Sequence, residues 1–316
     1  MKISLNVIPE CPIEEIVQIA KHAEKLGYQR CWVYDEGLAT RDVHIVMTAI
    51  ALETSHMEIG PGITNPYTRH PAQTAAAIMT LDELSKGRAF LGIGAGGSLT
   101  LDPLEIRREK PLTAVKDTIE ITRKLLTGER VSYEGLIASI ESAQIDYTRQ
   151  DIEIWLAGRG PKMLALGGEL ADGVMLDFIY KPELGEYIEN IRHSKKTKVC
   201  YSTAIVTDEQ DLEFVRPHMT YRLVDAPPRV KESIGITTEE VDRIRSALSG
   251  GLESAARHVK DEWIAPFIIQ GTPSECREEI REICDKNEVD EFLIPMFDMP
   301  DPKQYLDQIA SILLPA

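Results

Sequence analysis

The sequence predicts an α/β protein of the (β/α)8 TIM-type barrel class, with a helical insertion after the seventh strand. Short apolar runs alternate with helical patterns, eight such runs can be recognised, and several of the helical patterns carry start or stop signals. Strands that alternate with helices form a parallel sheet, and eight such units close into a barrel. The alternative is an open doubly wound sheet. However, no glycine fingerprint follows the first strand, which leads into Pro9 and Pro12 instead.

Each expected strand is a short apolar run that ends at a polar or glycine-rich segment. Runs of roughly four to eight residues are typical of strands that are buried on both faces. The chain starts with such a run, which is too short and too polar for a signal peptide. The eight expected strands cover residues 3–7, 30–34, 57–63, 89–93, 152–156, 173–176, 198–205 and 291–295.

The expected helices show apolar residues at three- and four-residue spacing. In the first helix these residues form one stripe, which stops at Gly27, a common C-terminal signal. Two others begin with Pro161 and Pro273, at a position where the missing N–H of proline costs nothing. The expected helices cover residues 13–26, 72–84, 113–126, 161–170, 238–248 and 273–287.

Two stretches are longer than an ordinary loop between a strand and a helix, namely 94–110 and about 208–266. The second contains the helical pattern at 238–248, so we expect an insertion with helices of its own. Insertions after barrel strands usually shape the mouth of a pocket or an oligomer contact. We therefore expect a single barrel domain over residues 1–316, with the insertion at about 208–266.

The chain is acidic, with 51 Asp and Glu against 35 Lys and Arg and a formal net charge of −16. Nucleic acids and anionic membranes bind basic surfaces, so we expect neither as a partner. No apolar run reaches the roughly 18 residues of a membrane span. The five cysteines form no C-x-x-C pair and are odd in number, which predicts reduced thiols in a cytoplasmic protein and no metal site.

The segment after the third strand, 60–71, reads Gly-Pro-Gly-Ile-Thr-Asn-Pro-Tyr-Thr-Arg-His-Pro. Pro61 lacks an N–H and Gly62 allows unusual backbone angles, so a regular ladder cannot continue here. The segment then offers a hydroxyl, an amide, a phenol, a guanidinium and an imidazole. This is typical of a barrel-strand end that forms part of a pocket, although an ordinary polar turn has the same composition.

Two further strand ends are rich in glycine. After the fourth strand, Gly92, Gly94 and Gly96 alternate, which lets a flat ring or a phosphate approach the backbone. After the fifth strand, residues 157–160 (Ala-Gly-Arg-Gly) precede a helix, whose first N–H groups can bind an anion together with nearby cations. A plain turn explains the first pattern equally well, and ordinary helix-start chemistry is the alternative for the second.

Two adjacent carboxylates, Asp35 and Glu36, follow the second strand. Neighbouring side chains at a strand end point in different directions, so at most one of them faces the barrel axis directly. Asp35 can bond the edge of a ring, and Glu36 can donate a proton if burial raises its pKa. An exposed acidic loop or a helix cap is the alternative. The histidines form no zinc-binding pattern, and no G-x-S-x-G nucleophile motif is present.

Together these segments resemble the bacterial-luciferase-like superfamily of flavin and deazaflavin enzymes. Within it they are most similar to the coenzyme F420-dependent methylenetetrahydromethanopterin reductase family. The resemblance covers residues 1 to about 180, returns at 271–275 and is poor through the insertion. The motifs that carry it are residues 8–15, 60–71, 81–88, 91–97, 110–112, 160–164 and 171–173.

The resemblance implies that coenzyme F420, with FMN as the alternative, lies at the carboxyl ends of the barrel strands. It also implies a non-prolyl cis peptide between Gly62 and Ile63. Asp35 and Thr64 are expected to position the ring, with Glu36 as the candidate acid. The expected cofactor-binding residues are Gly62, Ile63, Thr64, Asn65, Gly94, Gly96, Ala157, Gly158, Arg159 and Gly160.

The implied function is an oxidoreductase that transfers a hydride between coenzyme F420 and a small organic substrate. The alternatives are an FMN-dependent monooxygenase of the same fold and a flavin-binding protein without turnover. A homo-oligomer, either a dimer or a tetramer, is expected. The reductases carry acids where this chain has Asn6 and near Gly97, and often histidine at Glu36. We therefore expect a substrate other than a methanopterin, with Glu36 as the proton donor.

Overall fold

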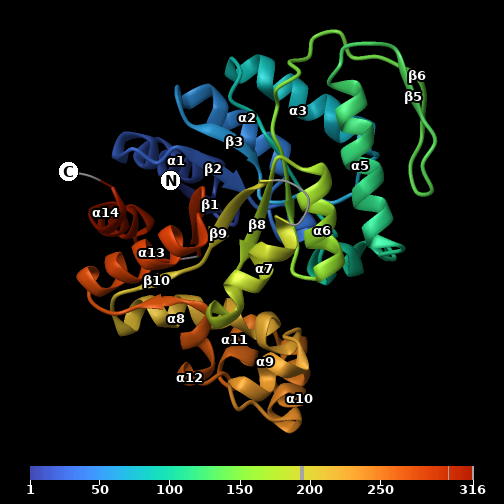
Figure 1. Ribbon diagram of the computed structural model, residues 1–316. Coiled ribbons are helices and arrows are strands. Elements are labelled where there is room, and N and C mark those ends of the chain that lie inside the picture. Colours follow the sequence, from blue (N-terminus) through green and yellow to red (C-terminus); the bar gives the residue numbers. More distant parts are fainter. Residues whose placement is uncertain (193–195, 298, 315–316) are drawn as a thin grey trace.

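The computed structural model describes residues 1–192, 196–297 and 299–314, and its centre is a parallel barrel (Figure 1). Ile59 bridges to Ala89 and Thr64 to Ile93, so the two edge strands also meet and the sheet closes. This confirms the expected (β/α)8 fold. The strands follow the order β3 (Glu58–Pro61), β2 (Arg30–Val33), β1 (Lys2–Val7), β12 (Glu291–Met296), β9 (Lys198–Ser202), β8 (Gly173–Asp177), β7 (Ile154–Ala157) and β4 (Leu91–Gly94).

Helices cover the outside of the barrel (Figure 1). Gly27 ends the first of them, α1, with a left-handed φ of 98°. Thr272 and Glu275 form a reciprocal cap at the start of α13. The expected helices are all present, within two residues at each end. The barrel helices are α1 (Ile13–Leu26), α2 (Val43–Glu53), α3 (Pro71–Ser85), α5 (Pro111–Leu125), α6 (Pro161–Leu170), α7 (Leu184–Ile191), α13 (Pro273–Asn287) and α14 (Pro302–Leu313).

The insertion follows β9, and the strand expected at 198–205 divides in two. The barrel strand ends at Ser202, and the Thr203 hydroxyl donates to the Phe267 carbonyl of the insertion at 2.6 Å. The next residues, β10 (Ile205–Val206), pair in parallel with β11 (Ile269–Gln270). Between these two short strands lie α8 (Glu209–Val224), α9 (Pro228–Ser233), α10 (Thr238–Ala247), α11 (Leu252–Ala256) and α12 (Asp261–Ile264).

A separate hydrophobic cluster holds the insertion together and attaches it to the barrel. Met219, Leu223 and Trp263 belong to it, and each is at most 1% exposed. Phe178 and Phe297 join the same cluster, and they directly follow the carboxyl ends of β8 and β12. The insertion therefore packs over the carboxyl end of the barrel, where Figure 1 shows it as a lobe of α9 to α12 beyond α8.

A short antiparallel hairpin, β5 (Val131–Tyr133) and β6 (Ile140–Ala143), has no counterpart among the expected elements. The buried carboxylate of Asp117 on α5 fixes it. That carboxylate accepts bonds from the Tyr133 hydroxyl at 2.9 Å and from the Ile137 N–H at 2.8 Å. The hairpin is thus held by a carboxylate that lies outside it in the sequence, and the local sequence pattern does not contain this information.

The amino end of the barrel is closed by a network of charges around Arg30, which is 1% exposed. Its guanidinium donates to Glu58 at 2.7 Å, to Glu153 at 2.7 Å and to Glu291 at 2.8 Å. Two indole N–H groups complete the set, since Trp32 donates to Glu291 at 2.8 Å and Trp155 donates to Glu153 at 2.9 Å. Lys2 and Lys198 pair with Glu58 and Glu153 from outside.

The thiols of Cys31, Cys200, Cys276 and Cys284 are buried, and Cys11 is half-buried. Over the described part of the chain, no group of histidine, cysteine and acidic side chains is arranged to hold a metal ion. None of the helices within that part combines the length and the apolar character needed to span a membrane.

Candidate active site

A cavity of about 570 Å³ opens at the carboxyl ends of the barrel strands. Its walls come from the ends of β1, β2, β3, β4, β7 and β8, and from α8 of the insertion. All predicted site residues except Thr64 and Gly94 are among its lining residues. The lining consists of Asn6, Tyr34, Asp35, Glu36, Gly62, Ile63, Asn65, Ala95, Gly96, Gly97, Leu99, Thr100, Arg108, Pro111, Ala157, Gly158, Arg159, Gly160, Met163, Met175, Asp177 and Arg222.

The chain after β3 forms one wall, and the Gly62–Ile63 peptide is cis as expected. Thr64 is 2% exposed and does not line the cavity. Its hydroxyl donates instead to the Asp35 carboxylate at 2.6 Å. The Thr64 hydroxyl therefore holds the Asp35 carboxylate in place, and Asp35 is a lining residue of the cavity.

The glycines in β4 and directly after it have two different roles. A Cβ on Gly94 would collide with the Ile63 side chain, and one on Gly92 would collide with the Pro61 carbonyl. These two glycines let the first and last strands of the sheet approach, which is a packing role, and Gly94 is accordingly not part of the lining. Gly96 does line the cavity, with a left-handed φ of 72°.

Two buried amides, Asn6 and Asn65, each have one end engaged by the backbone and one end without a partner. Asn6 donates through Nδ2 to the Gly62 carbonyl at 3.0 Å, while Asn65 accepts through Oδ1 from the Tyr67 N–H at 2.9 Å. These bonds fix which atom faces the other way. Asn6 Oδ1 and Asn65 Nδ2 are buried, and neither bonds any described residue. An unpaired buried polar atom is costly, and because both residues line the cavity, Asn6 Oδ1 can accept and Asn65 Nδ2 can donate a hydrogen bond to a ligand there.

The segment after β7 approaches the cavity with its backbone. Gly160 caps the amino end of α6, and a Cβ built on it meets nothing within 4 Å. Gly158 is tighter, since a Cβ there would lie 2.6 Å from Met163. Arg159 lines the same wall, whereas Lys162 does not. Open backbone N–H groups at a helix start, beside a guanidinium, can hold a phosphate.

Glu36 lies at the cavity, largely enclosed by protein. Burial raises its pKa, and repulsion from the Glu10 and Asp35 carboxylates adds to the effect, while Arg222 opposes it. A carboxyl group with a raised pKa holds its proton at higher pH and can act as a general acid.

Tyr34, Asp177 and Arg222 are among the lining residues that the sequence analysis missed. Arg222 projects from α8 and pairs with Asp177, which also accepts from the Ser202 hydroxyl at 2.7 Å. Burial and the nearby Arg159 lower the pKa of Arg222 to about 9. Asp177 ends the sixth barrel strand, so the strand-end rule used for Asp35 could have found it. No local signal marks Arg222.

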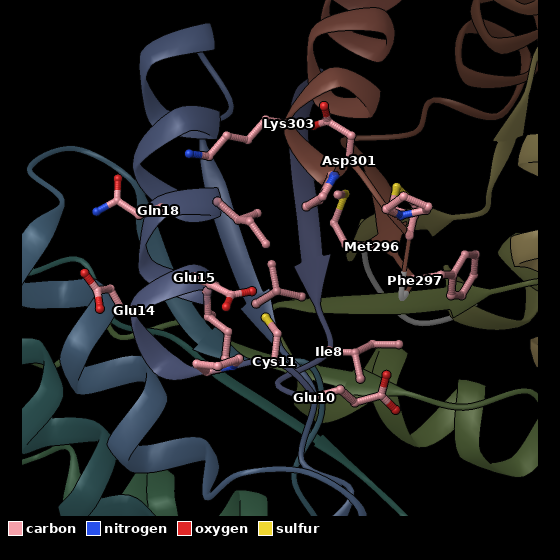
Figure 2. A pocket seen from close by; sticks show the side chains of 17 residues that line it. Ile8, Glu10, Cys11, Glu14, Glu15, Gln18, Met296, Phe297, Asp301 and Lys303 are labelled. Atoms are coloured by element: carbon pink, nitrogen blue, oxygen red, sulfur yellow. The ribbon is translucent and has the colours of Figure 1, made fainter.

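A second cavity of about 460 Å³ lies between the start of α1 and the start of α14 (Figure 2). Glu14, Glu15, Asp301 and Lys303 line it, together with apolar side chains such as Met296. None of the predicted site residues lines this cavity, so the barrel mouth is the better candidate for the active site.

Comparison with known proteins agrees with this geometry. The family model described as luciferase-like monooxygenase matches residues 4–287. A 5,10-methylenetetrahydromethanopterin reductase from Archaeoglobus fulgidus is 33% identical, over 100% of this chain and 99% of that protein. The reductase of the same name from Methanolobus tindarius is 31% identical, over 90% of this chain and 91% of that protein.

The fold matches a solved structure of this group. The coenzyme F420-dependent tetrahydromethanopterin reductase from Methanopyrus kandleri superposes with a TM-score of 0.90 and 27% identity, over 99% of this chain and 98% of that one. The family match spans most of the sequence, and the barrel closes in the same way. The chain is therefore a member of the luciferase-like monooxygenase family.

Proposed function

We propose that this protein is an oxidoreductase that transfers a hydride between coenzyme F420 and a small organic substrate. The observation that carries the proposal is a single cavity with two kinds of binding group. One wall offers the unpartnered amide of Asn65, and another offers the open helix start at Gly160. The named relatives are F420-dependent reductases and dehydrogenases, which supports the choice of cofactor.

The residues fit a deazaflavin that carries a phosphate. Asn65 Nδ2 can donate to a ring carbonyl, and this would satisfy an amide that is 2% exposed. The phosphate would be held at Gly158, Arg159 and Gly160 by backbone N–H groups and one guanidinium. The flat backbone of Gly62 and Ile63 would lie against the ring, and Gly96 would allow close approach.

The cofactor supplies the hydride chemistry when bound, and the chain supplies placement and the proton. Asp35, fixed by the Thr64 hydroxyl at 2.6 Å, would orient the ring edge. Glu36 would donate a proton from its carboxyl group to the substrate, and burial favours this role because it raises the pKa of that carboxyl. Met163 and Met175 add apolar surface to the cavity, which helps to exclude water.

Parallel binding experiments with F420 and FMN test the cofactor. We expect saturable binding of F420, followed by its absorbance change when substrate is added. Tight binding of FMN with oxygen consumption would instead indicate a monooxygenase of the same fold. Binding of either ring without turnover across a broad panel of carbonyl and alcohol substrates would indicate a flavin-binding protein.

The substrate is proposed to be other than a methanopterin. The resemblance implies that Asn6 occupies a position where the reductases carry an acid, and an amide cannot release a proton. Gly97 likewise offers no side chain. Efficient reduction of methylenetetrahydromethanopterin by the unmodified protein would contradict this part of the proposal.

A homo-oligomer, either a dimer or a tetramer, is also proposed. Ile45 and Leu52 on the outer face of α2 are 60% and 65% exposed, and such apolar side chains favour association. Light scattering of the purified protein measures the subunit number, and a monomer at all concentrations would contradict the proposal. The cytoplasmic location stays a prediction.

A further inference from the structure

The insertion contributes one described residue to the lining of the central cavity, and that residue is Arg222. It lies near the carboxyl end of α8, between the barrel and the rest of the insertion. A charged side chain that the insertion sends into the cavity is a candidate for substrate selection.

Arg222 is held in place before any ligand arrives. Its Nη2 donates to the Asp177 carboxylate, and its guanidinium carbon lies 5.6 Å from the centre of the Phe178 ring. The side chain is 24% exposed. The remaining guanidinium N–H groups form no hydrogen bond to any described residue, so several donors are unused and already oriented.

Tyr34 lines the same cavity, and its phenol interacts electrostatically with this guanidinium. Burial raises the pKa of its phenol, with Arg222 opposing the effect, so the phenol stays a hydrogen-bond donor at neutral pH. Over the described ranges, its hydroxyl has no hydrogen-bond partner. An arginine fork and a phenol O–H are suitable partners for the oxygens of a carboxylate or a phosphate.

We propose that Arg222 and Tyr34 bind an anionic group, a carboxylate or a phosphate, on the substrate. The proposal deepens the function proposed above and depends on it. The cofactor phosphate is proposed to bind at the start of α6, where Arg159 lies near Arg222, so the F420 affinity of the variants is needed to distinguish the two anions. Asp177 balances the charge of Arg222 without occupying all its donors, so the guanidinium can bind an anion while staying anchored.

The test uses the F420-loaded protein and calorimetric titration with benzoate, glutarate and inorganic phosphate, with benzamide as the neutral control. We expect saturable binding of at least one anion and none of benzamide. Arg222→Met should weaken anion binding about tenfold to hundredfold, and Tyr34→Phe by up to about tenfold. Arg222→Lys keeps the charge beside Asp177 but loses the fork, and it should also weaken binding.

Arg245→Met serves as the matched control, since Arg245 is an exposed arginine of the insertion that pairs only with Asp242. It should bind the anions like the unmodified protein. Equal anion binding by the three site variants and the unmodified protein, or no anion binding at all, would overturn the proposal.

F420 affinity is measured on the same variants. If Arg222→Met loses F420 affinity by the same factor as it loses anion affinity, Arg222 binds the phosphate of the cofactor. This result would overturn the assignment of Arg222 to the substrate. Failure of the unmodified protein to bind F420 would instead overturn the proposed function. In that case the anion titration is repeated on the cofactor-free protein. Weaker anion binding by the site variants would then support an anion site at Arg222, and equal binding would overturn it.

Discussion

The two ends of the barrel use charged and polar side chains in opposite ways. At the amino end, Arg30 is enclosed by three glutamates, and two indole N–H groups complete their bonds. At the carboxyl end, Asn6 and Asn65 each have a buried atom without a partner, and Arg222 has unused donors. Both ends contain buried polar groups, but the charges around Arg30 are paired, whereas Asn6 and Asn65 each have an amide atom without a partner.

The difference separates stability from binding. The side chains of a fully paired charge network hold strands together, and they have no free hydrogen-bond donor or acceptor for a ligand. A buried group without a partner destabilises the free protein and recovers that cost when a ligand supplies the missing bond. In barrels of this class the carboxyl face carries function and the opposite face carries stability, and these residues show the physical reason.

The largest effect is expected at the carboxyl end, on turnover. Glu36→Gln keeps the shape and hydrogen bonding of the side chain but cannot donate a proton, so turnover should fall roughly 10²–10⁴-fold. The measurement is the rate of the F420 absorbance change with the best substrate of a panel. Glu14→Gln, an exposed glutamate on α1, is the control and should retain full activity. Near-normal turnover of the Glu36 variant would remove it as the acid.

At the amino end, we expect the substitution Arg30→Met to lower the free energy of unfolding without changing F420 affinity. Arg30→Met leaves three carboxylates close together without their common partner, and breaking a buried pair costs about 3–5 kcal/mol. Urea unfolding should show this loss, while the folded fraction still binds F420 with normal affinity. The exposed control Arg245→Met should cost at most about 1 kcal/mol. A comparable loss in both variants would mean that the network adds nothing beyond an ordinary surface pair.

A pair of carboxylate-to-amide substitutions should show pH effects of opposite sign at the two ends. Burial alone would raise the pKa of Glu153, but Lys198 and Arg30 outweigh it and lower the pKa to about 2. Its contribution to stability is therefore present above about pH 4.5 and is lost as the pH falls towards 2. Glu153→Gln should cost about 2–3 kcal/mol at pH 7, and the difference should disappear near pH 2.

Glu36 has a raised pKa, so the folded protein binds its proton more tightly than the unfolded chain does. Wild-type stability should then decline as the pH rises from the unfolded pKa of about 4.3 through the folded pKa. Glu36→Gln removes this decline, so the variant should be more stable than the wild type at pH 8 and similar at pH 4. Thermal melts across this range check the sign. A Glu36 variant less stable at pH 8 would contradict it.

The smallest expected effect concerns the backbone at the start of α6. Gly160→Val has open space for its side chain, so the protein should fold normally. The new side chain would block approach of the cofactor phosphate and weaken F420 binding at least tenfold, or about 1.4 kcal/mol. Gly185→Ala, at an exposed position on α7, is the control. Unchanged F420 affinity in a folded Gly160 variant would remove this segment from the proposed site.

The sequence was sufficient for features that depend on neighbouring residues. Apolar runs, helix signals and strand-end glycines predicted the barrel and led to a cavity at the correct end of it. Gly94 shows the limit of that approach, because a glycine that packs against Ile63 and one that faces a ligand look the same in a sequence.

Features that depend on distant residues could not be predicted. The hairpin at β5 and β6 requires the Asp117 carboxylate, and Arg222 reaches the cavity only because the insertion packs over Phe178 and Phe297. The unpaired atoms of Asn6 and Asn65 are also visible only in three dimensions, since the opposite end of each amide is bonded to backbone.

The pairing of β10 with β11 gives the molecule a modular construction. Ile205 lies beside Ile269 and Val206 beside Gln270, so the chain departs for the insertion and returns from it at one place. The segment between them has its own hydrophobic cluster and supplies one cavity side chain. An exchange of the insertion between related proteins would replace the cavity wall that carries Arg222, while the residues after β7 would stay the same. Substrate specificity could then change by recombination at one place in the chain, without a change in the residues proposed to bind the cofactor.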